Sequence, residues 1–268
     1  DVIYLQVIWA IGLSMIALAA LIGLPKKLLW IISLTIIFGH NLLDQISFSN
    51  VPIINNLWLI LHERGWIEFG NIIRFRTSYP VLPWIGVIAL GYCIGAKVFD
   101  PSIEPNKRNK LLLTFGLSSM TLFFILRLIN VYGDQAWSIM PTFTESLMSF
   151  INVTKYPPSL LFILWNVGIG LILLVMLQKV ETKSWIKPLI VFGSVPMFFY
   201  IVHLYVLKGL YLIAVEVFGK NYGDYYGVSS VAMLWFISFF LCIGLYPLMV
   251  KFSNFKHKNK HISLLKYF

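Results

Sequence analysis

The chain has 268 residues, of which 59% are hydrophobic, 16% aromatic and only 12% charged. A soluble domain carries roughly 25% charged and 45–50% apolar residues. The composition therefore excludes an ordinary soluble domain and predicts a helical membrane protein. Two cysteines are too few for a disulfide scaffold. The net charge of +10 needs an explanation of its own.

Seven apolar segments are candidate membrane spans, because a spanning helix needs about 20 mostly apolar residues. They are residues 2–24, 28–44, 81–96, 111–131, 159–177, 195–218 and 228–250. The second is the weakest, since its last turn (GHNLLD, 39–44) is polar. We therefore predict an all-α fold, a polytopic transmembrane helix bundle of about seven spans. It forms a single integral-membrane domain over residues 1–268, with a basic tail at 251–268.

The basic residues between the segments predict the sides of the membrane, because cytoplasmic loops are enriched in Lys and Arg. Fourteen lie in one alternating set of connections: Lys26, Lys27, Lys97, Lys107, Arg108, Lys110, Lys179, Lys183, Lys187, Lys251, Lys256, Lys258, Lys260 and Lys266. Five lie in the other set: Arg64, Arg74, Arg76, Lys155 and Lys220. We predict a cytoplasmic C-terminus, an extracytoplasmic N-terminus, and basic residues that meet anionic lipid rather than nucleic acid.

Two extracytoplasmic loops are long, and long loops in compact proteins are usually functional. Loop 45–80 contains the apolar stretch 51–61, which predicts a helix on or in the membrane surface. Loop 132–158 is too apolar and aromatic for a disordered linker. His62 and the tail residues His257 and His261 are interpreted as loop residues.

Ionisable residues inside membrane spans are expensive and are candidate functional residues. His40 and Asp44 are four residues apart, which predicts one helical face and a carboxylate that orients an imidazole base. The predicted topology places the candidates in the outer half of the bundle: His40, Asn41, Asp44, Arg127, Asn130, Asp134, Tyr200 and His203. Arg127 has the alternative of pairing with Asp134, and His203 that of bonding a neighbouring helix. No metal site with zinc spacing is present in the sequence.

Several strings, in this order, resemble bacterial membrane proteins of the heparan-alpha-glucosaminide N-acetyltransferase catalytic-domain family. They are GHNLLD (39–44), YPVLPWIG (79–86), LRLINVYGD (126–134), TKYPPSL (154–160), FGSVPMFFYIVHLY (192–205) and LYP (245–247). The resemblance implies transfer of an acetyl group from acetyl-CoA to an amino sugar or another extracytoplasmic glycan at the bacterial cytoplasmic membrane. Family members begin with a span that carries an Asp-x-x-Arg-Gly-like string and then a catalytic His candidate. Neither is found here, so we expect an N-terminally truncated chain.

Acetyl transfer to an amine needs a base for the ammonium proton and donors for the oxyanion. We assign His40, Asp44 and His203 as catalytic candidates, with Tyr200 beside His203 on the acetyl path. Acceptor contacts or the outer mouth are assigned to Asn41, Arg127, Asn130, Asp134, Lys155 and Tyr156. If acetyl-CoA enters from the cytoplasm, its phosphates are assigned to Lys107, Arg108 and Lys110, which otherwise anchor the topology. No metal cofactor is expected, and a homo-oligomer is compatible with the sequence. The alternatives are a transporter or flippase for a polar solute and a non-catalytic membrane scaffold.

Overall fold

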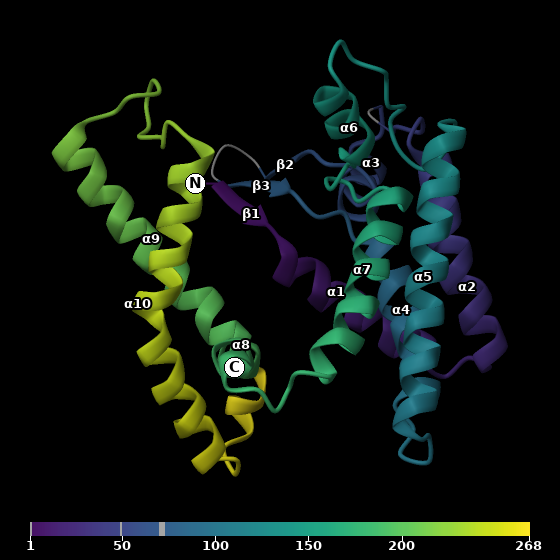
Figure 1. The fold of residues 1–268 in the computed structure, drawn as a ribbon. Coiled ribbons are helices and arrows are strands. Elements are labelled where there is room, and N and C mark those ends of the chain that lie inside the picture. Colours follow the sequence, from purple (N-terminus) through teal and green to yellow (C-terminus); the bar gives the residue numbers. More distant parts are fainter. Residues whose placement is uncertain (1, 49, 70–72) are drawn as a thin grey trace. The chain divides into compact units, whose positions relative to one another are not determined.

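A computed structural model describes residues 2–48, 50–69 and 73–268, and most of them are helical. The chain divides into two compact units, Asp1–Leu177 and Gln178–Phe268, and each is described by itself. The prediction of a single integral-membrane domain stays a prediction. Figure 1 labels the helices and strands used below.

The first unit begins with β1 (Val2–Leu5), α1 (Val7–Leu21), α2 (Lys26–Gly39) and the 3-10 helix η1 (His40–Leu43). It continues with α3 (Pro52–Leu61), β2 (Trp66–Phe69), β3 (Ile73–Thr77) and α4 (Leu82–Val98). The last helices are α5 (Pro105–Ile129), α6 (Phe143–Ile151) and α7 (Leu160–Gln178). The helix predicted at 51–61 is confirmed as α3, and its location at the membrane surface stays a prediction.

A three-stranded sheet in the first unit corrects the all-α prediction. Its strand order is β1-β3-β2, with β1 parallel and β2 antiparallel to β3. Val2 pairs with Arg74, so the first four described residues form a strand and not the start of a spanning helix. The run Val-Ile-Tyr-Leu is apolar, and apolar content alone does not distinguish a strand from a helix. The pairing with β3, distant in sequence, decides the conformation.

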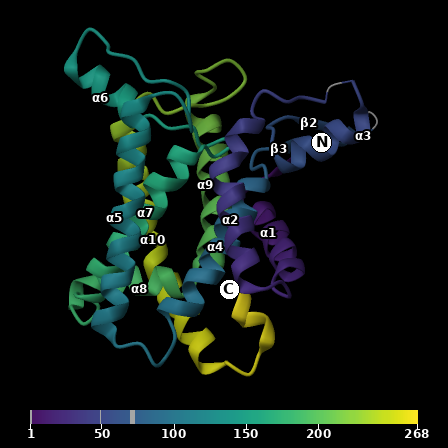
Figure 2. The ribbon, with the colours of Figure 1, turned by 90° about the vertical axis from the view of Figure 1, so that its right-hand side faces the viewer.

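Helices α2, α4, α5 and α7 enclose the core of the first unit (Figure 2). Ile37, Phe123, Leu160 and Leu161 form one buried cluster, with side chains of α4 packed against it. Small residues allow close helix approach. A Cβ added at Gly86 of α4 would lie 2.9 Å from the Ile36 side chain of α2. The missing side chain of Gly86 therefore lets α2 and α4 pack closely just before the polar end of α2.

Five helices of the described residues are long and apolar enough to cross a membrane: Lys26–Leu43, Pro105–Ile129, Leu160–Gln178, Pro196–Phe218 and Val231–Lys258. Each of the seven predicted segments contains most of a helix, but α1 and α4 have only 15 and 17 residues. A spanning helix needs about 20 mostly apolar residues. The structure therefore supports a polytopic helical membrane protein. The count of seven spans and the sides of the termini stay predictions.

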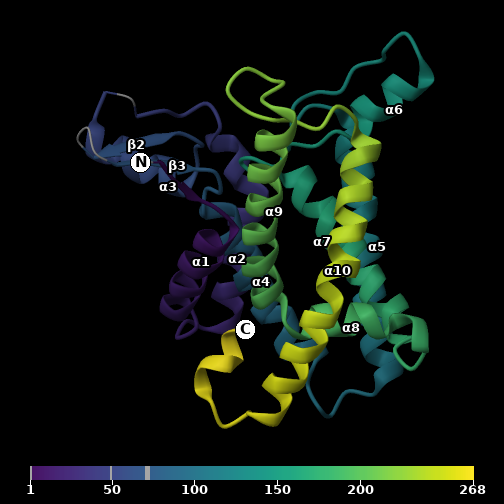
Figure 3. The same cartoon turned by 90° about the vertical axis from the view of Figure 1, so that its left-hand side faces the viewer.

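The second unit contains η2 (Ser184–Ile186), α8 (Lys187–Ser194), α9 (Pro196–Phe218), α10 (Val231–Lys258) and η3 (Ser263–Tyr267). Figure 3 shows α9 and α10 running beside each other. Ser194 Oγ lies 2.9 Å from Ser253 Oγ, and Lys256 Nζ donates to the Ser194 carbonyl oxygen at 2.8 Å. The first part of the predicted tail, 251–258, thus continues α10 and joins it to the end of α8.

Candidate functional site

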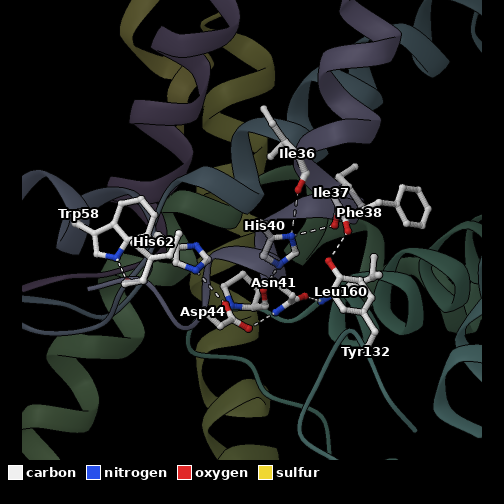
Figure 4. A network of polar contacts seen from close by, with 12 residues as sticks. Ile36, Ile37, Phe38, His40, Asn41, Asp44, Trp58, His62, Tyr132 and Leu160 are labelled. Atoms are coloured by element: carbon white, nitrogen blue, oxygen red, sulfur yellow. Dashed lines mark hydrogen bonds and ion pairs between the residues drawn. The ribbon is translucent and has the colours of Figure 1, made fainter. Parts of the chain in front are cut away.

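A carboxylate–imidazole pair joins the ends of two helices in the first unit (Figure 4). Asp44 follows η1, and His62 follows α3. The His62 Nε2 lies 2.9 Å from Asp44 Oδ1, and Asn41 Nδ2 donates to Asp44 Oδ2 at 2.8 Å. The His62 side chain is 4% exposed, whereas that of Asp44 is 45% exposed. The pair therefore combines a buried imidazole with a partly exposed carboxylate.

The hydrogen bonds hold Asp44 ionised. Burial raises the pKa of this carboxyl, but the hydrogen bonds from His62 and Asn41 together lower it by more than burial raises it. The pKa of Asp44 therefore lies below its ordinary value. A carboxylate only accepts hydrogen bonds, so His62 Nε2 carries the proton of this contact. His62 Nδ1 is buried and has no hydrogen-bonding partner among the described residues.

The predicted pairing of His40 with Asp44 is wrong, because Asp44 pairs with His62. The chain tightens from α2 into a 3-10 helix at His40. With three residues per turn, positions i and i+4 no longer share one face. His40 instead bridges backbone carbonyl oxygens: Nδ1 contacts those of Ile36 and Ile37, and Nε2 contacts that of Pro158 at 2.9 Å. His40 thus ties the end of α2 to the segment before α7.

Asp44 and His62 line a cavity of about 260 Å³. Its lining brings together segments that are far apart in the sequence: Asn41, Asp44, Ile46, Trp58, His62, Glu63, Asp134, Gln135, Thr154, Pro157 and Ser159. The predicted candidates Asn41, Asp44 and Asp134 therefore meet in one place. We call this space the polar cavity.

Asp134 has a structural role at the edge of the polar cavity. Its carboxylate accepts hydrogen bonds from the backbone N–H and the hydroxyl of Thr154, from the Ser159 hydroxyl and from the Gln135 N–H, at 2.6–2.8 Å. Asp134, the predicted pairing partner of Arg127, thus fastens the segment before α7. Asn41 also holds this region in place, because its side-chain oxygen accepts a hydrogen bond from the Leu160 N–H at 2.8 Å.

Arg127 is 2% exposed and bonds only to backbone. Its guanidinium donates to the carbonyl oxygens of Gln135, Ser149, Phe150 and Asn152, each at 2.8 Å. Three of these acceptors lie at the carboxyl end of α6, where a cation also complements the helix dipole. Asn130, at a positive φ of 59°, exchanges two hydrogen bonds with the backbone of Trp137. Both residues hold the segment 132–158, whose extracytoplasmic location stays a prediction.

Lys155 and Tyr156 form an exposed aromatic cluster with Tyr79. The two hydroxyls lie 3.0 Å apart, and Lys155 Nζ lies 5.1 Å from the centre of the Tyr156 ring. The hydrogen bond with Tyr79 and the contact with Lys155 lower the pKa of Tyr156, although burial opposes this. Tyr156 immediately precedes Pro157, which lines the polar cavity, so the cluster is adjacent in sequence to the lining of that cavity.

The remaining candidates lie outside the polar cavity. Tyr200 and His203 belong to the second unit, where His203 Nδ1 contacts the Phe199 carbonyl oxygen at 2.9 Å and the two side-chain rings lie 5.5 Å apart. Lys107, Arg108 and Lys110 lie in the first turns of α5, and Arg108 Nε is buried without a partner among the described residues. No group of three or more metal-ligating side chains occurs among the residues that the structure describes.

Residues 1–128 match the family model described as heparan-alpha-glucosaminide N-acetyltransferase, catalytic. These residues, just under half of the chain, are similar to that family. The match confirms the family predicted from the sequence, and with the apolar helices it indicates an integral membrane protein of an acetyltransferase family. Comparison with curated proteins and with solved structures gives no match. The matched residues include Asn41, Asp44 and His62, but not the 134–159 wall of the polar cavity.

Sequence reasoning missed His62, which was interpreted as a loop residue. The available indication was its position: His62-Glu63-Arg64 ends an apolar stretch in a long loop that is predicted to be extracytoplasmic. Trp58 precedes His62 by one helical turn, and the two rings lie 5.0 Å apart. Trp58 Nε1 also donates to the Ile46 carbonyl oxygen, so α3 brings both rings against the end of η1.

Proposed function

We propose that this protein is a membrane-embedded acyltransferase that moves an acetyl group from acetyl-CoA to an amino sugar or another extracytoplasmic glycan. The observation that carries the proposal is the buried His62 imidazole paired with Asp44 in the polar cavity, in a chain whose first 128 residues are similar to an acetyltransferase family. We place the protein in the bacterial cytoplasmic membrane, with the polar cavity on the extracytoplasmic side, as the distribution of basic residues favours.

The proposed reaction uses His62 as the general base. The acceptor nitrogen attacks the thioester carbonyl carbon, the carbon–sulfur bond breaks, and the thiolate of CoA leaves. The nitrogen gives up one proton, which the unpartnered Nδ1 of His62 accepts. Asp44 holds the proton on Nε2 and stabilises the imidazolium that forms. An oriented base of this kind contributes about 10²–10⁴-fold to the rate.

We propose a different role for His40 than for His62. Because carbonyl oxygens face both ring nitrogens of His40, no nitrogen lone pair of this ring is free for a substrate in this conformation. We therefore propose that His40 positions the end of α2, and with it Asn41 and Asp44. Lys107, Arg108 and Lys110 lie in the first turns of α5, which runs about 36 Å from its first residue to its end near the polar cavity, so their contact with the phosphates of acetyl-CoA stays a prediction and is not used in the transfer proposed at His62.

The test is acetyl transfer by the full-length protein in proteoliposomes, with radiolabelled acetyl-CoA and a glucosamine acceptor. His62→Gln is expected to lower kcat about 100-fold with unchanged thermal stability. His261→Gln, a substitution of an exposed histidine in the second unit, is the matched control and is expected to keep full activity. Full activity of His62→Gln removes His62 as the base.

A polar cavity between apolar helices also fits a transporter or flippase for a polar solute. Uptake of such a solute into proteoliposomes without CoA, together with no labelled acetyl on any acceptor, would establish transport instead. A scaffold shows neither activity and tolerates both Asp44→Asn and His62→Gln.

A further inference from the structure

The first unit contains a second cavity, about 520 Å³ in volume, that is almost entirely apolar. It lies between α2, α4, α5 and α7, and its wall includes Leu34, Ile37, Leu90, Phe115, Ile163 and Val167. None of the described residues that line it is charged. The polar side chains among its lining residues are those of Trp30, Ser118 and Ser119, and the Ser119 hydroxyl donates to the Leu164 carbonyl oxygen at 2.8 Å. We call this space the apolar cavity.

The polar and apolar cavities follow one another along the same two helices. On α2 and η1, Ile37 and Phe38 line the apolar cavity, and Asn41 and Asp44 line the polar one. On α7, Ile163 lines the apolar cavity and Ser159, just before the helix, lines the polar one. Four helical residues span about 6 Å. Along α2 and α7, the residues that line the polar cavity therefore follow directly on those that line the apolar cavity.

The α4 wall of the apolar cavity is open where it has glycines. Gly91 and Gly95 both line the cavity, and a Cβ added at either would meet no atom within 4 Å. Glycine is about 1 kcal/mol worse than alanine in a helix interior. The two glycines are one helical turn apart on the same face, so the space they leave is continuous along α4.

We propose that the apolar cavity binds the hydrocarbon chain of an amphiphilic acceptor whose polar head group lies in the polar cavity. The acceptor is then a lipid-linked amine rather than a free glycan. The role of the head group rests on the proposed function, but binding of the chain does not. A dry apolar cavity favours an apolar occupant, its volume lies in the range of ligand cavities, and the surrounding bilayer supplies hydrocarbon chains.

Photolabelling tests binding of the chain. Full-length protein in nanodiscs is labelled with a single-chain phosphatidylcholine that carries a diazirine in mid-chain, and the labelled residues are mapped by mass spectrometry. We expect labelling of Ile37, Phe115 or Val167. The double variant Gly91→Leu/Gly95→Leu places two side chains in the cavity, where an added Cβ meets no other atom. We expect its labelling of cavity residues to be about tenfold lower than that of the wild type, which corresponds to the loss of burial of about two methylene groups of the bound chain. Gly170→Leu, at an equally open glycine of α7 outside the cavity lining, is the control and keeps it.

Absence of label on cavity residues in the wild-type protein overturns the inference. Equal labelling of the wild type and the double variant does so as well, because the probe then reaches these residues from the bilayer. His62→Gln is expected to keep the full labelling while it loses acetyl transfer. Failure of the proposed chemistry is thereby distinguished from failure of chain binding.

Acceptor preference tests the link between the two cavities. We expect the wild-type protein to acetylate a lipid-linked glucosamine with a kcat/KM about tenfold higher than for free glucosamine. The double variant is expected to lose this preference and to keep transfer to free glucosamine. Equal kcat/KM for both acceptors in the wild type overturns the lipid-linked assignment. If neither acceptor is acetylated but cavity residues are labelled, the proposed function fails and chain binding stands.

Discussion

Arg127 and His62 are buried polar residues of the first unit that differ in how completely their hydrogen-bonding groups are satisfied. The Arg127 guanidinium donates to four backbone carbonyl oxygens, and Arg127 is not itself among the residues that line the polar cavity. His62, which lines the polar cavity, pairs through Nε2 with Asp44 and leaves its buried Nδ1 without a partner among the described residues. A fully bonded buried charge organises structure, whereas an oriented group with a free lone pair can accept a proton. The comparison teaches that burial and charge alone do not indicate a catalytic residue.

Loss of Arg127 gives the largest expected effect on stability. Arg127→Met keeps the volume of the side chain but leaves four buried carbonyl oxygens without their donor. Unsatisfied buried groups cost about 1–3 kcal/mol each when no water replaces the donor, so we expect a loss of roughly 3 kcal/mol or more. Thermal unfolding in detergent measures it, and limited proteolysis within 132–158 shows whether this segment loosens first. Arg64→Met, at an exposed arginine, is the control. Unchanged unfolding of Arg127→Met would contradict the structural role.

Loss of the Asp44 charge tests the Asp44–His62 pair. Asp44→Asn keeps the shape and one hydrogen bond, but it no longer fixes the proton on His62 Nε2 or stabilises the imidazolium. We expect kcat to fall at least about tenfold, with a stability change below about 1 kcal/mol because the Asp44 side chain is partly exposed. Acetyl transfer at saturating acetyl-CoA together with thermal unfolding separates the two effects. A large loss of stability with normal kcat would assign Asp44 to structure.

The sequence was sufficient for the helices but not for the pairing of Asp44 with His62. Apolar runs predicted α2, α5, α7, α9 and α10 because burial in lipid depends on local composition. They did not predict that Val2–Leu5 forms a strand, since its partner β3 lies far along the chain. The spacing of His40 and Asp44 presumed an α-helix, and the 3-10 turn at His40 broke the presumed face. His62 reaches Asp44 only through the packing of α3, which no local pattern records.

Acidification offers a smaller test of the Asp44–His62 pair. Because the folded-state pKa of Asp44 is lowered, its contribution to stability is present above the unfolded value of about 3.9 and is lost as the pH falls through the lower folded-state pKa. We expect the stability difference between the wild type and Asp44→Asn to be constant near pH 6 and to shrink below about pH 4. Thermal unfolding of both proteins over this range measures it. A difference that grows towards acid pH would show that Asp44 is destabilised by its surroundings.

The exposed cluster at Tyr156 provides the smallest expected effect on stability and separates binding from folding. Tyr156→Phe removes the hydroxyl that lies 3.0 Å from that of Tyr79 but keeps the ring under Lys155. An exposed substitution of this kind changes stability by less than about 0.5 kcal/mol. If Tyr156 contacts the acceptor, as we predict, the KM for the acceptor rises while kcat and the KM for acetyl-CoA stay constant. Tyr79→Phe removes the same hydroxyl contact from the other side and is the matched control. Equal KM changes in both variants assign the effect to the shared hydrogen bond, whereas a change confined to Tyr156→Phe assigns it to contact with the acceptor.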